Sequence, residues 1–339
     1  MKRRPPLFML FLILALIPVF LWGLLSGSAG LGAGEMAGAF RYLLDRRGDR
    51  TAALVLFGIR LPRVLMAMAA GASLGVSGAA FQGLFRNALA DPYIIGASSG
   101  ASLGAGIAIS FGLSLGPFPP APLFAFAGSL LAVMLAFVIS RSAGNPPPAA
   151  SLLLAGTSVG ALFSSLLSLV LVIRDRNLYQ VYYWLLGSLG GASWASLRPV
   201  LPVMTAGCIV VFIFSRPLDL LIQGDETAES LGVNVNRMRL VIAAGASLAA
   251  AAAVAAAGII GFVGLIAPHG ARLFAGPGHR RLLPAAALGG ALMLAAADTL
   301  ARTVVPPMEI PLGIITGLGG APFFLYLLAR HGRSLGRLS

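Results

Sequence analysis

Residues 215–239 read SRPLDLLIQGDETAESLGVNVNRMR and form a polar segment between two long apolar blocks. Four carboxylates cluster in this segment, at Asp219, Asp225, Glu226 and Glu229. Asp225 can cap a short helix whose first turn carries Glu226, because the positive N-terminus of a helix favours carboxylates. The segment is therefore expected to fold locally and not to remain an open loop.

A turn and a second helix complete the segment. Ala228 and Leu231 share a face of the first helix. Gly232 predicts a left-handed end to that helix, and Asn234 can start a second short helix. We expect residues 225–237 to form a compact amphipathic elbow, which a membrane-crossing turn alone does not need. The alternative interpretation is a solvated loop that its arginines hold at the inner face of a membrane.

The composition places the chain in a membrane. Of its 339 residues, 58% are hydrophobic and 10% are charged, which leaves too little polar surface to cover a soluble domain. The formal charge of +13 comes from arginines spread between apolar runs. This spacing is typical of membrane-edge anchors, so we expect contact with lipid and none with nucleic acid. The predicted fold class is an all-α polytopic protein of the inner (cytoplasmic) membrane.

The chain lacks the residues for several kinds of chemistry. Lys2 is its only lysine, and a phosphate-binding P-loop needs a lysine after its glycine turn. If ATP drives the protein, a partner subunit holds ATP and Mg²⁺, and this chain binds no cofactor. The single cysteine, Cys208, excludes a disulfide framework and a thiolate metal site. His279 and His331 lie beside arginines and suggest no metal cluster.

Apolar runs predict ten membrane spans within a single transmembrane domain, residues 1–339. The first run is long for a signal peptide and nine others follow it, so we interpret it as an uncleaved helix. Both termini are then cytoplasmic. Residues 32–50 carry apolar side chains at helical spacing, which predicts a helix lying on the outer surface. The expected spans cover residues 7–25, 61–82, 93–115, 121–140, 149–173, 200–214, 239–260, 265–275, 282–301 and 310–330.

The arginines favour this orientation. Arg86, Arg141, Arg216 and Arg237 fall on the cytoplasmic side, as the positive-inside rule expects. The exception is residues 41–63, which hold six arginines on the outer side. That exception needs its own explanation.

Two spans are unusual in a matching way. The third carries Gly96, Gly100 and Gly104 at four-residue spacing, a ridge that lets another backbone approach closely. The eighth is short and interrupted by Pro268. Each is the second member when spans two to five are paired with spans seven to ten, which indicates an inverted repeat with a pathway near its interface. Alternatively, glycine and proline are simply common in membrane helices.

Several segments together resemble one family, the FecCD-type permeases of type II ABC importers, which take up iron chelates, haem and corrinoids. The resemblance covers about residues 55–330 and departs mildly at Asn87-Ala88-Leu89, where the family often has a central proline. The segments are RLPRVLMAMAAGASLGVSGAAFQGLFRNALADPYIIGASSGASLGA at 60–105, LLLAG at 152–156, WLLGSLGGASW at 184–194, ESLGV at 229–233, GFVGLIAPH at 261–269, ADTLAR at 297–302 and IPLGIITGLGGAPFFLYLL at 310–328.

The resemblance implies a larger assembly. Family members work as dimers, with two ATPase subunits beneath and one soluble substrate-binding protein above. The elbow is then similar to the coupling helices that sit in a groove of the ATPase. Its residues in that role are Asp225, Glu226, Glu229, Leu231 and Gly232.

Three arginines match docking positions of the family. Arg60 and Arg63, expected at the outer end of span two, and Arg302, just past span nine, match arginines that receive glutamates of the binding protein. Two copies of each would make a basic cradle that orients and captures this partner. The alternative is that these arginines only snorkel to the membrane interface.

The resemblance also implies a pathway along the dimer axis, bordered by spans five and ten. By the family pattern, the loop with Asn87 and Leu89 closes the channel on the cytoplasmic side. Span five carries Thr157 and Ser158, whose hydroxyls can face a wet pathway or bond back to their own helix. Back-bonding is the safer expectation for any one of them.

The outer mouth of span five suggests the cargo. Arg174 and Arg176 are followed by Tyr179, Tyr182 and Tyr183, so a flat anionic ligand would find guanidinium and aromatic partners there. Haem fits this set and is preferred to a ferric siderophore, with a corrinoid third. The alternative is an ordinary polar cap outside a span.

Two other function classes were considered. An intramembrane serine protease would use Ser77 with His269, although a packed histidine is commoner beside a helix break. An ion-coupled secondary transporter would need an ionisable group within the membrane, and Asp298 is the candidate. We expect Asp298 to pair locally with Arg302 at i+4 instead.

Overall fold

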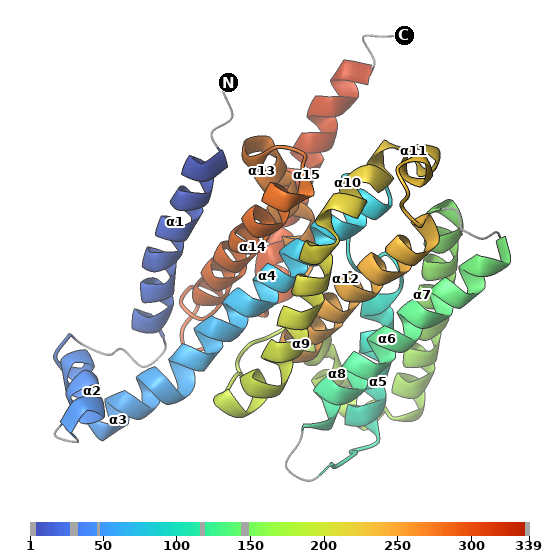
Figure 1. Ribbon diagram of the computed structural model, residues 1–339. Coiled ribbons are helices and arrows are strands. Elements are labelled where there is room, and N and C mark those ends of the chain that lie inside the picture. Colours follow the sequence, from blue (N-terminus) through green and yellow to red (C-terminus); the bar gives the residue numbers. More distant parts are fainter. Residues whose placement is uncertain (1–4, 28–32, 46–47, 116–118, 144–148, 336–339) are drawn as a thin grey trace.

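The structure is a bundle of helices (Figure 1). The computed structural model describes residues 5–27, 33–45, 48–115, 119–143 and 149–335. Each of the ten predicted spans corresponds to one helix, which confirms the all-α fold class. These helices are α1 (Pro5–Leu25), α4 (Leu61–Leu84), α5 (Ala97–Ser110), α6 (Pro120–Ser140), α7 (Ala149–Ile173), α9 (Trp194–Ile213), α12 (Val235–Ala257), α13 (Val263–Ala275), α14 (His279–Ala301) and α15 (Leu312–Leu335).

Shorter elements connect these helices. They are α2 (Ala33–Asp45), α3 (Arg50–Ala53), the π-helical turn η1 (Leu54–Arg60), the 3₁₀ turns η2 (Arg141–Ala143) and η3 (Asp175–Asn177), α8 (Leu178–Leu185), α10 (Ser215–Gln223) and α11 (Asp225–Ser230). In the described part of the chain, seven helices are long and apolar enough to cross a membrane by length and composition. The other three predicted spans are α5, α13 and α15, of which α5 and α13 have 14 and 13 residues.

The two short helices confirm that the third and eighth spans are a matched pair, but α13 continues through Pro268, so the interruption expected at that residue is wrong. Both begin directly after a residue with left-handed backbone, Gly96 before α5 and Phe262 before α13. The packing is reciprocal as well: α4 packs on α14, α12 packs on α6, and α4 and α12 pack on each other. The first helix of each set therefore contacts the third helix of the other set, which is the pattern that an inverted repeat produces.

The predicted ridge of small residues packs against a neighbouring backbone. A Cβ added at Gly100 would lie 2.2 Å from the carbonyl oxygen of Gly128 on α6, and one at Gly104 would lie 2.0 Å from that of Phe124. The same close approach joins α4 to α14, where Gly71 faces Gly290. Only glycine allows these helix pairs to approach so closely.

The second span begins earlier than predicted. α3, η1 and α4 form one continuous rod of 35 residues, Arg50–Leu84. Arg60 and Arg63 therefore lie well inside the rod and not at its outer end, which corrects the sequence prediction. The π-helical turn is stabilised across the bundle, because the indole Nε1 of Trp194 donates to the Phe57 carbonyl at 2.8 Å. The helix predicted within residues 32–50 is confirmed as α2.

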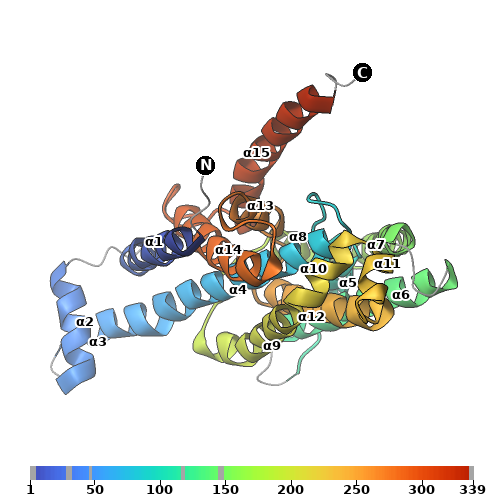
Figure 2. The same cartoon turned by 45° about the horizontal axis from the view of Figure 1, so that its top comes forward.

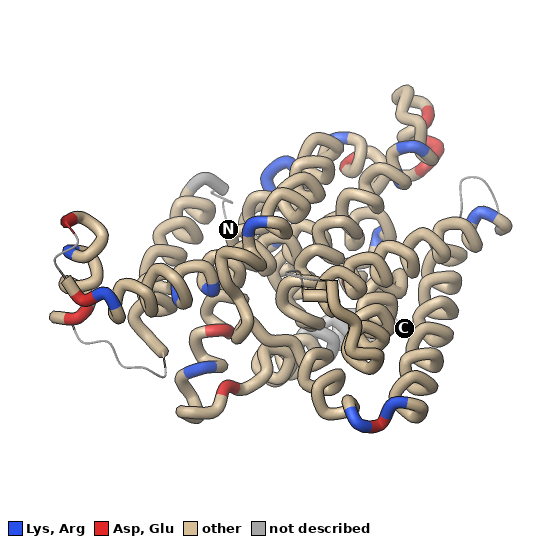
Figure 3. The backbone as a smooth tube through the Cα atoms, turned by 90° about the horizontal axis from the view of Figure 1, so that it is seen from below, with Lys and Arg blue, Asp and Glu red and all other residues tan. Residues whose placement is uncertain are grey.

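The two ends of the bundle carry different elements. α10 and α11 lie at the same end as the start of α1 and the end of α15, whereas α2, α3 and α8 lie at the opposite end (Figure 1). α15 leaves the bundle beside α13 and stands apart from the other helices (Figure 2). Charged residues gather at helix ends and connecting segments, with long uncharged stretches between them (Figure 3). The charged ends at 1–4 and 336–339 lie outside the described residues.

Candidate functional site

The elbow is anchored to the bundle through α10. Leu218 and Leu221 are fully buried beneath it. The Asp219 carboxylate accepts a hydrogen bond from the backbone N–H of His279 at 2.9 Å and lies 2.7 Å from Nδ1 of the same residue. His279 is the first residue of α14, so Asp219 caps that helix from another element. The base of the elbow is thereby fixed to span nine.

Asp225 has a different role from the one predicted. The residue at the N-cap of α11 is Gly224, and no side chain caps this end, so the predicted cap is wrong. The Asp225 carboxylate instead accepts hydrogen bonds from Arg239 at 2.8 and 2.9 Å and from Arg86. Charge-assisted bonds to two guanidinium groups stabilise this carboxylate more than one backbone N–H of a short helix would.

The end of α11 follows the predicted turn chemistry. Gly232 has a φ of 80°, its N–H donates to the Glu229 carbonyl, and the N–H of Val233 donates to the Ala228 carbonyl, both at 2.9 Å. This pair of bonds is a Schellman motif, in which glycine adopts the left-handed conformation. Asn234 then caps the next helix, as predicted, by accepting from the N–H of Arg237 at 2.9 Å. That helix is α12, so the expected second short helix is the first turn of span seven.

The elbow leaves one exposed face. Ala228 is fully buried, whereas Leu231 is 61% exposed, so the expectation that they share a face is wrong. Leu231 lies just past the last residue of α11, where the chain turns. Glu226 and Glu229 are also exposed. An apolar side chain beside two carboxylates thus projects from this end of the bundle.

The loop predicted as a gate lies against the elbow. Asn87 and Leu89 are exposed, and the Asn87 Oδ1 accepts from the Leu89 N–H at 2.9 Å, which gives the loop a compact turn. The preceding residue, Arg86, donates from Nε to the Leu221 carbonyl at 2.9 Å and pairs with Asp225. Sequence reasoning placed Arg86 on the inner side but gave it no role. A long-range contact of this kind leaves no signal in local spacing.

The same loop carries a partly buried carboxylate. Asp91 accepts a hydrogen bond from the Tyr93 N–H at 2.8 Å. Burial raises the pKa of Asp91 to about 6, because the low-polarity surroundings disfavour the charged form. The loop between α4 and α5 therefore holds a group that titrates near neutral pH.

Span five has one packed and one open face. Leu152, Val159, Phe163 and Leu167 are buried on the packed side. Thr157 and Ser158 lie on the exposed side, and the Thr157 hydroxyl donates to the Leu154 carbonyl at 3.0 Å, which confirms the expected back-bonding. α7 therefore presents a face with hydroxyl groups that the described residues leave exposed.

The end of this helix that leads into α8 is rich in arginine and tyrosine. Arg174 lies over the ring of Phe111, with its guanidinium carbon 4.9 Å from the ring centroid. Arg176 is exposed. The rings of Tyr179 and Tyr183 on α8 lie 4.5 Å apart, centroid to centroid. Cationic and flat aromatic groups thus meet at one end of the open face.

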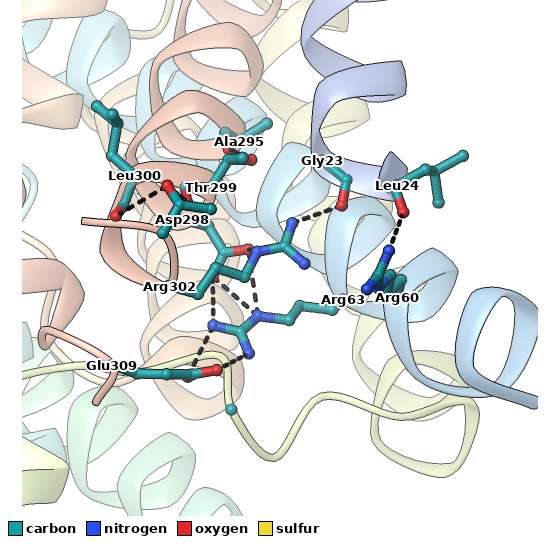
Figure 4. A network of polar contacts seen from close by, with 12 residues as sticks. Gly23, Leu24, Arg60, Arg63, Ala295, Asp298, Thr299, Leu300, Arg302 and Glu309 are labelled. Atoms are coloured by element: carbon teal, nitrogen blue, oxygen red, sulfur yellow. Dashed lines mark hydrogen bonds and ion pairs between the residues drawn. The ribbon is translucent and has the colours of Figure 1, made fainter. Parts of the chain in front are cut away.

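At the α2 end, Arg63 lies between two carboxylates (Figure 4). Its Nε and Nη2 donate to the Asp298 Oδ1 at 3.0 and 2.9 Å, and its Nη1 donates to the Glu309 Oε1 at 2.8 Å. Arg302 forms the predicted i+4 pair with Asp298, at 3.4 Å. Asp298 is 1% exposed. A carboxylate held between two arginines already has its counter-charges. Asp298 therefore gives no support to an ion-coupled mechanism.

The other contacts of these arginines fix the first helix. Arg302 Nη2 donates to the Gly23 carbonyl at 2.7 Å, and Arg60 Nη1 donates to the carbonyls of Leu24 and Leu25, both at 2.9 Å. These carbonyls belong to the last turn of α1, where they have no partner within the helix and where positive charge is favourable. The arginines are buried and do not snorkel. We call Arg60, Arg63, Arg302, Asp298 and Glu309 the outer network.

The protease hypothesis gains no support from the geometry. The Ser77 hydroxyl donates to the Ala246 carbonyl at 2.8 Å in a fully buried position. The ring of His269 packs edge-on against Phe323, with centroids 6.5 Å apart. Because the serine proton is already bound to a backbone carbonyl, it is not held by a base.

Comparison with known proteins agrees with this architecture. The family model described as the FecCD transport family matches residues 12–330. A hemin transport system permease protein, HmuU of Yersinia pestis, is 42% identical over 97% of both chains. A cobalamin import system permease protein, BtuC of Halobacterium salinarum, is 46% identical over 82% of this chain and 74% of its own.

A solved structure has the same fold. It is assigned to the metal-chelate type of ABC transporter in an inward-facing conformation, is 32% identical, and superposes with a TM-score of 0.85 over 96% of this chain and 99% of its own. The matched region includes the elbow, the loop at Asn87 and the outer network. The chain is a membrane permease that belongs to the FecCD transport family.

Proposed function

We propose that this permease works in a binding-protein-dependent ABC importer as a homodimer, with two separate ATPase subunits bound at its elbows. One observation carries this proposal: the exposed face formed by Glu226, Glu229 and Leu231 stands on a base that is tied to spans nine and seven. A partner that pushes on this face would therefore act on the bundle and not on a loose loop. ATP and Mg²⁺ would belong to that partner.

The dimer contact would use the open faces of α7 and α15. On α7, Leu162 and Leu169 are 56% and 55% exposed, and on α15, Leu318 is 71% exposed. Both helices carry apolar side chains that the described part of the chain leaves uncovered. A passage between two copies would be lined by Thr157 and Ser158 and closed at the elbow end by Asn87 and Leu89. The elbow end, with both termini, would face the cytoplasm from the inner membrane.

The soluble substrate-binding protein would dock at the opposite end, over the outer network. Three arginines against two carboxylates leave this network positive, and a dimer would present it twice. Because the arginine side chains are buried, they would act on the binding protein through their electrostatic field and through the surface shape that they maintain. Such a field steers an acidic partner more than it increases affinity.

Haem is the cargo that the outer mouth favours. The exposed guanidinium of Arg176 and the neighbouring rings of Tyr179 and Tyr183 offer partners for the carboxylates and the flat ring of haem. The Yersinia pestis relative is named for hemin transport. Other relatives are named for cobalamin and for Fe(3+)-citrate, so a ferric siderophore or a corrinoid is the alternative cargo.

Reconstitution tests the transport mechanism. Vesicles that contain this chain and its ATPase should accumulate substrate when ATP and the binding protein are supplied, and an imposed proton or sodium gradient should not replace ATP. Uptake that persists without a nucleotide-hydrolysing partner would overturn the proposal. The absorption spectrum of the binding protein that co-purifies from native membranes tests the cargo, because bound haem gives a Soret band and a corrinoid or siderophore does not.

A further inference from the structure

Arg86 occupies a backbone position that suits glycine. Its φ is 50°, its N–H donates to the Gly83 carbonyl, and the N–H of Asn87 donates to the Gln82 carbonyl, both at 3.1 Å. This is the same Schellman motif that Gly232 completes at the end of α11. A side chain at the left-handed position of such a motif is unfavourable, and backbone strain of this kind occurs where function needs the side chain.

The side chain of Arg86 contacts both α10 and α11, the first helix of the elbow. Its Nε donates to the Leu221 carbonyl at 2.9 Å, in the last turn of α10, and its Nη2 pairs with Asp225, the first residue of α11. One guanidinium therefore joins the two helices across the Gly224 turn. The side chain is 41% exposed, so this contact can change without exposing a buried charge.

The main chain of Arg86 leads directly into the gate loop. The next residue, Asn87, accepts from the N–H of Leu89 through its side chain and from the N–H of Ala90 through its carbonyl, at 2.9 and 3.1 Å. These bonds make residues 87–90 one compact turn. A movement of Arg86 would therefore also move Asn87 and Leu89, because a compact turn joins these residues.

We propose that Arg86 is a positioning residue that transmits movement of the elbow to the gate loop. The inference rests on the proposed function, in which the elbow receives the ATPase and the loop closes the passage. When the elbow shifts, the Leu221 carbonyl and the Asp225 carboxylate move Arg86, and the turn at 87–90 follows. The chain offers a matched comparison, because Arg239 binds the same Asp225 carboxylate from α12, a helix that carries no gate residue.

The test measures the distance between the two gate loops of the assembled dimer. Spin labels are placed at Ala88 by A88C in a Cys208→Ser background, in the complex with its ATPase, and the label-to-label distance is recorded with and without ATP. Arg86→Gln should remove the nucleotide-dependent change in distance and lower ATP-driven uptake by about tenfold, within the usual range of coupling between sites. Arg239→Gln should keep the distance change. In both variants the ATPase should still co-purify.

A second variant separates signal transmission from folding. Arg86→Gly removes the side chain and also relieves the backbone strain, so it should fold at least as well as the wild type and still lose the distance change. Arg86→Gln or Arg86→Gly with a wild-type distance change would overturn the proposal. Equal loss in Arg239→Gln would also overturn it, because Asp225 would then matter only as an elbow contact. Failure of the wild-type chain to bind an ATPase would overturn the proposed function itself.

Discussion

The two charged clusters of this protein differ in how their carboxylates are buried. In the outer network Asp298 is 1% exposed and lies between Arg63 and Arg302. In the elbow the side chain of Asp225 is 36% exposed and lies between Arg86 and Arg239. Breaking a buried pair leaves an uncompensated charge in low-polarity surroundings, whereas water can replace a partner at an exposed pair. The geometry of the outer network is therefore fixed, whereas the contacts of the elbow can rearrange.

Removing Arg63 tests the fixed end and should have the largest effect. Arg63→Met leaves Asp298 and Glu309 without their shared partner, and we expect the free energy of unfolding to fall by about 3–5 kcal/mol. Thermal unfolding of the detergent-solubilised chain measures this. The conservative variant Arg63→Lys should lose much less, because it keeps a positive charge between Asp298 and Glu309. Equal losses in R63M and R63K would show that packing and not charge dominates here.

Changing the exposed face of the elbow tests the inner end. Leu231→Asp should detach the ATPase, because it places a charge where an apolar contact would be buried. A central apolar contact is typically worth about 2 kcal/mol or more, so affinity should fall by about thirtyfold. Co-purification and titration with the ATPase measure this, and Leu231→Met, which keeps volume and polarity, is the control. If L231D still assembled and transported, the elbow would not be the coupling surface.

The sequence predicted those features that depend on local chemistry. Left-handed backbone at Gly232 and the cap at Asn234 follow from the residue types themselves. The left-handed residue before α13 is Phe262, which the position of Pro268 did not indicate. The contact of Asp225 with Arg86 could not be predicted, because Arg86 lies 139 positions away in sequence.

The outer network shows the same limit. Sequence reasoning paired Asp298 with Arg302, which are one turn apart, but missed Arg63, which lies 235 positions from Asp298. It also missed that α3 and the π-helical turn extend span two, because their polar ends hide the continuity of the rod. Contacts between distant elements depend on how the helices pack. The inverted repeat determines this packing, and no pattern of charges in the sequence indicates it.

The partly buried Asp91 adds a third carboxylate to the comparison between Asp298 and Asp225. Its pKa is raised to about 6 by burial, above the value of about 3.9 in an unfolded chain. The folded state therefore binds the proton more tightly, and the stability that this provides is lost as pH rises through about 6. Between pH 5 and pH 7 the free energy of unfolding should fall by about 1 kcal/mol from this group. Unfolding temperatures across this range measure the change, and Asp91→Asn should flatten the profile.

The smallest expected effect concerns the exposed edge of the outer network. The Glu309 side chain is 40% exposed, whereas its partner Arg63 is buried, so Glu309→Gln makes the network more positive without leaving Asp298 unpaired. If the network acts through its field, the rate at which the binding protein associates should rise by about threefold at low salt, and the gain should vanish as salt screens the field. Stopped-flow association with the purified binding protein measures this rate. Asp175→Asn, which removes a carboxylate in η3 and away from the network, is the control for a general charge effect. A slower association in E309Q would mean that Glu309 itself contacts the partner, and the outer arginines would then serve only to hold α1 and α14 in place.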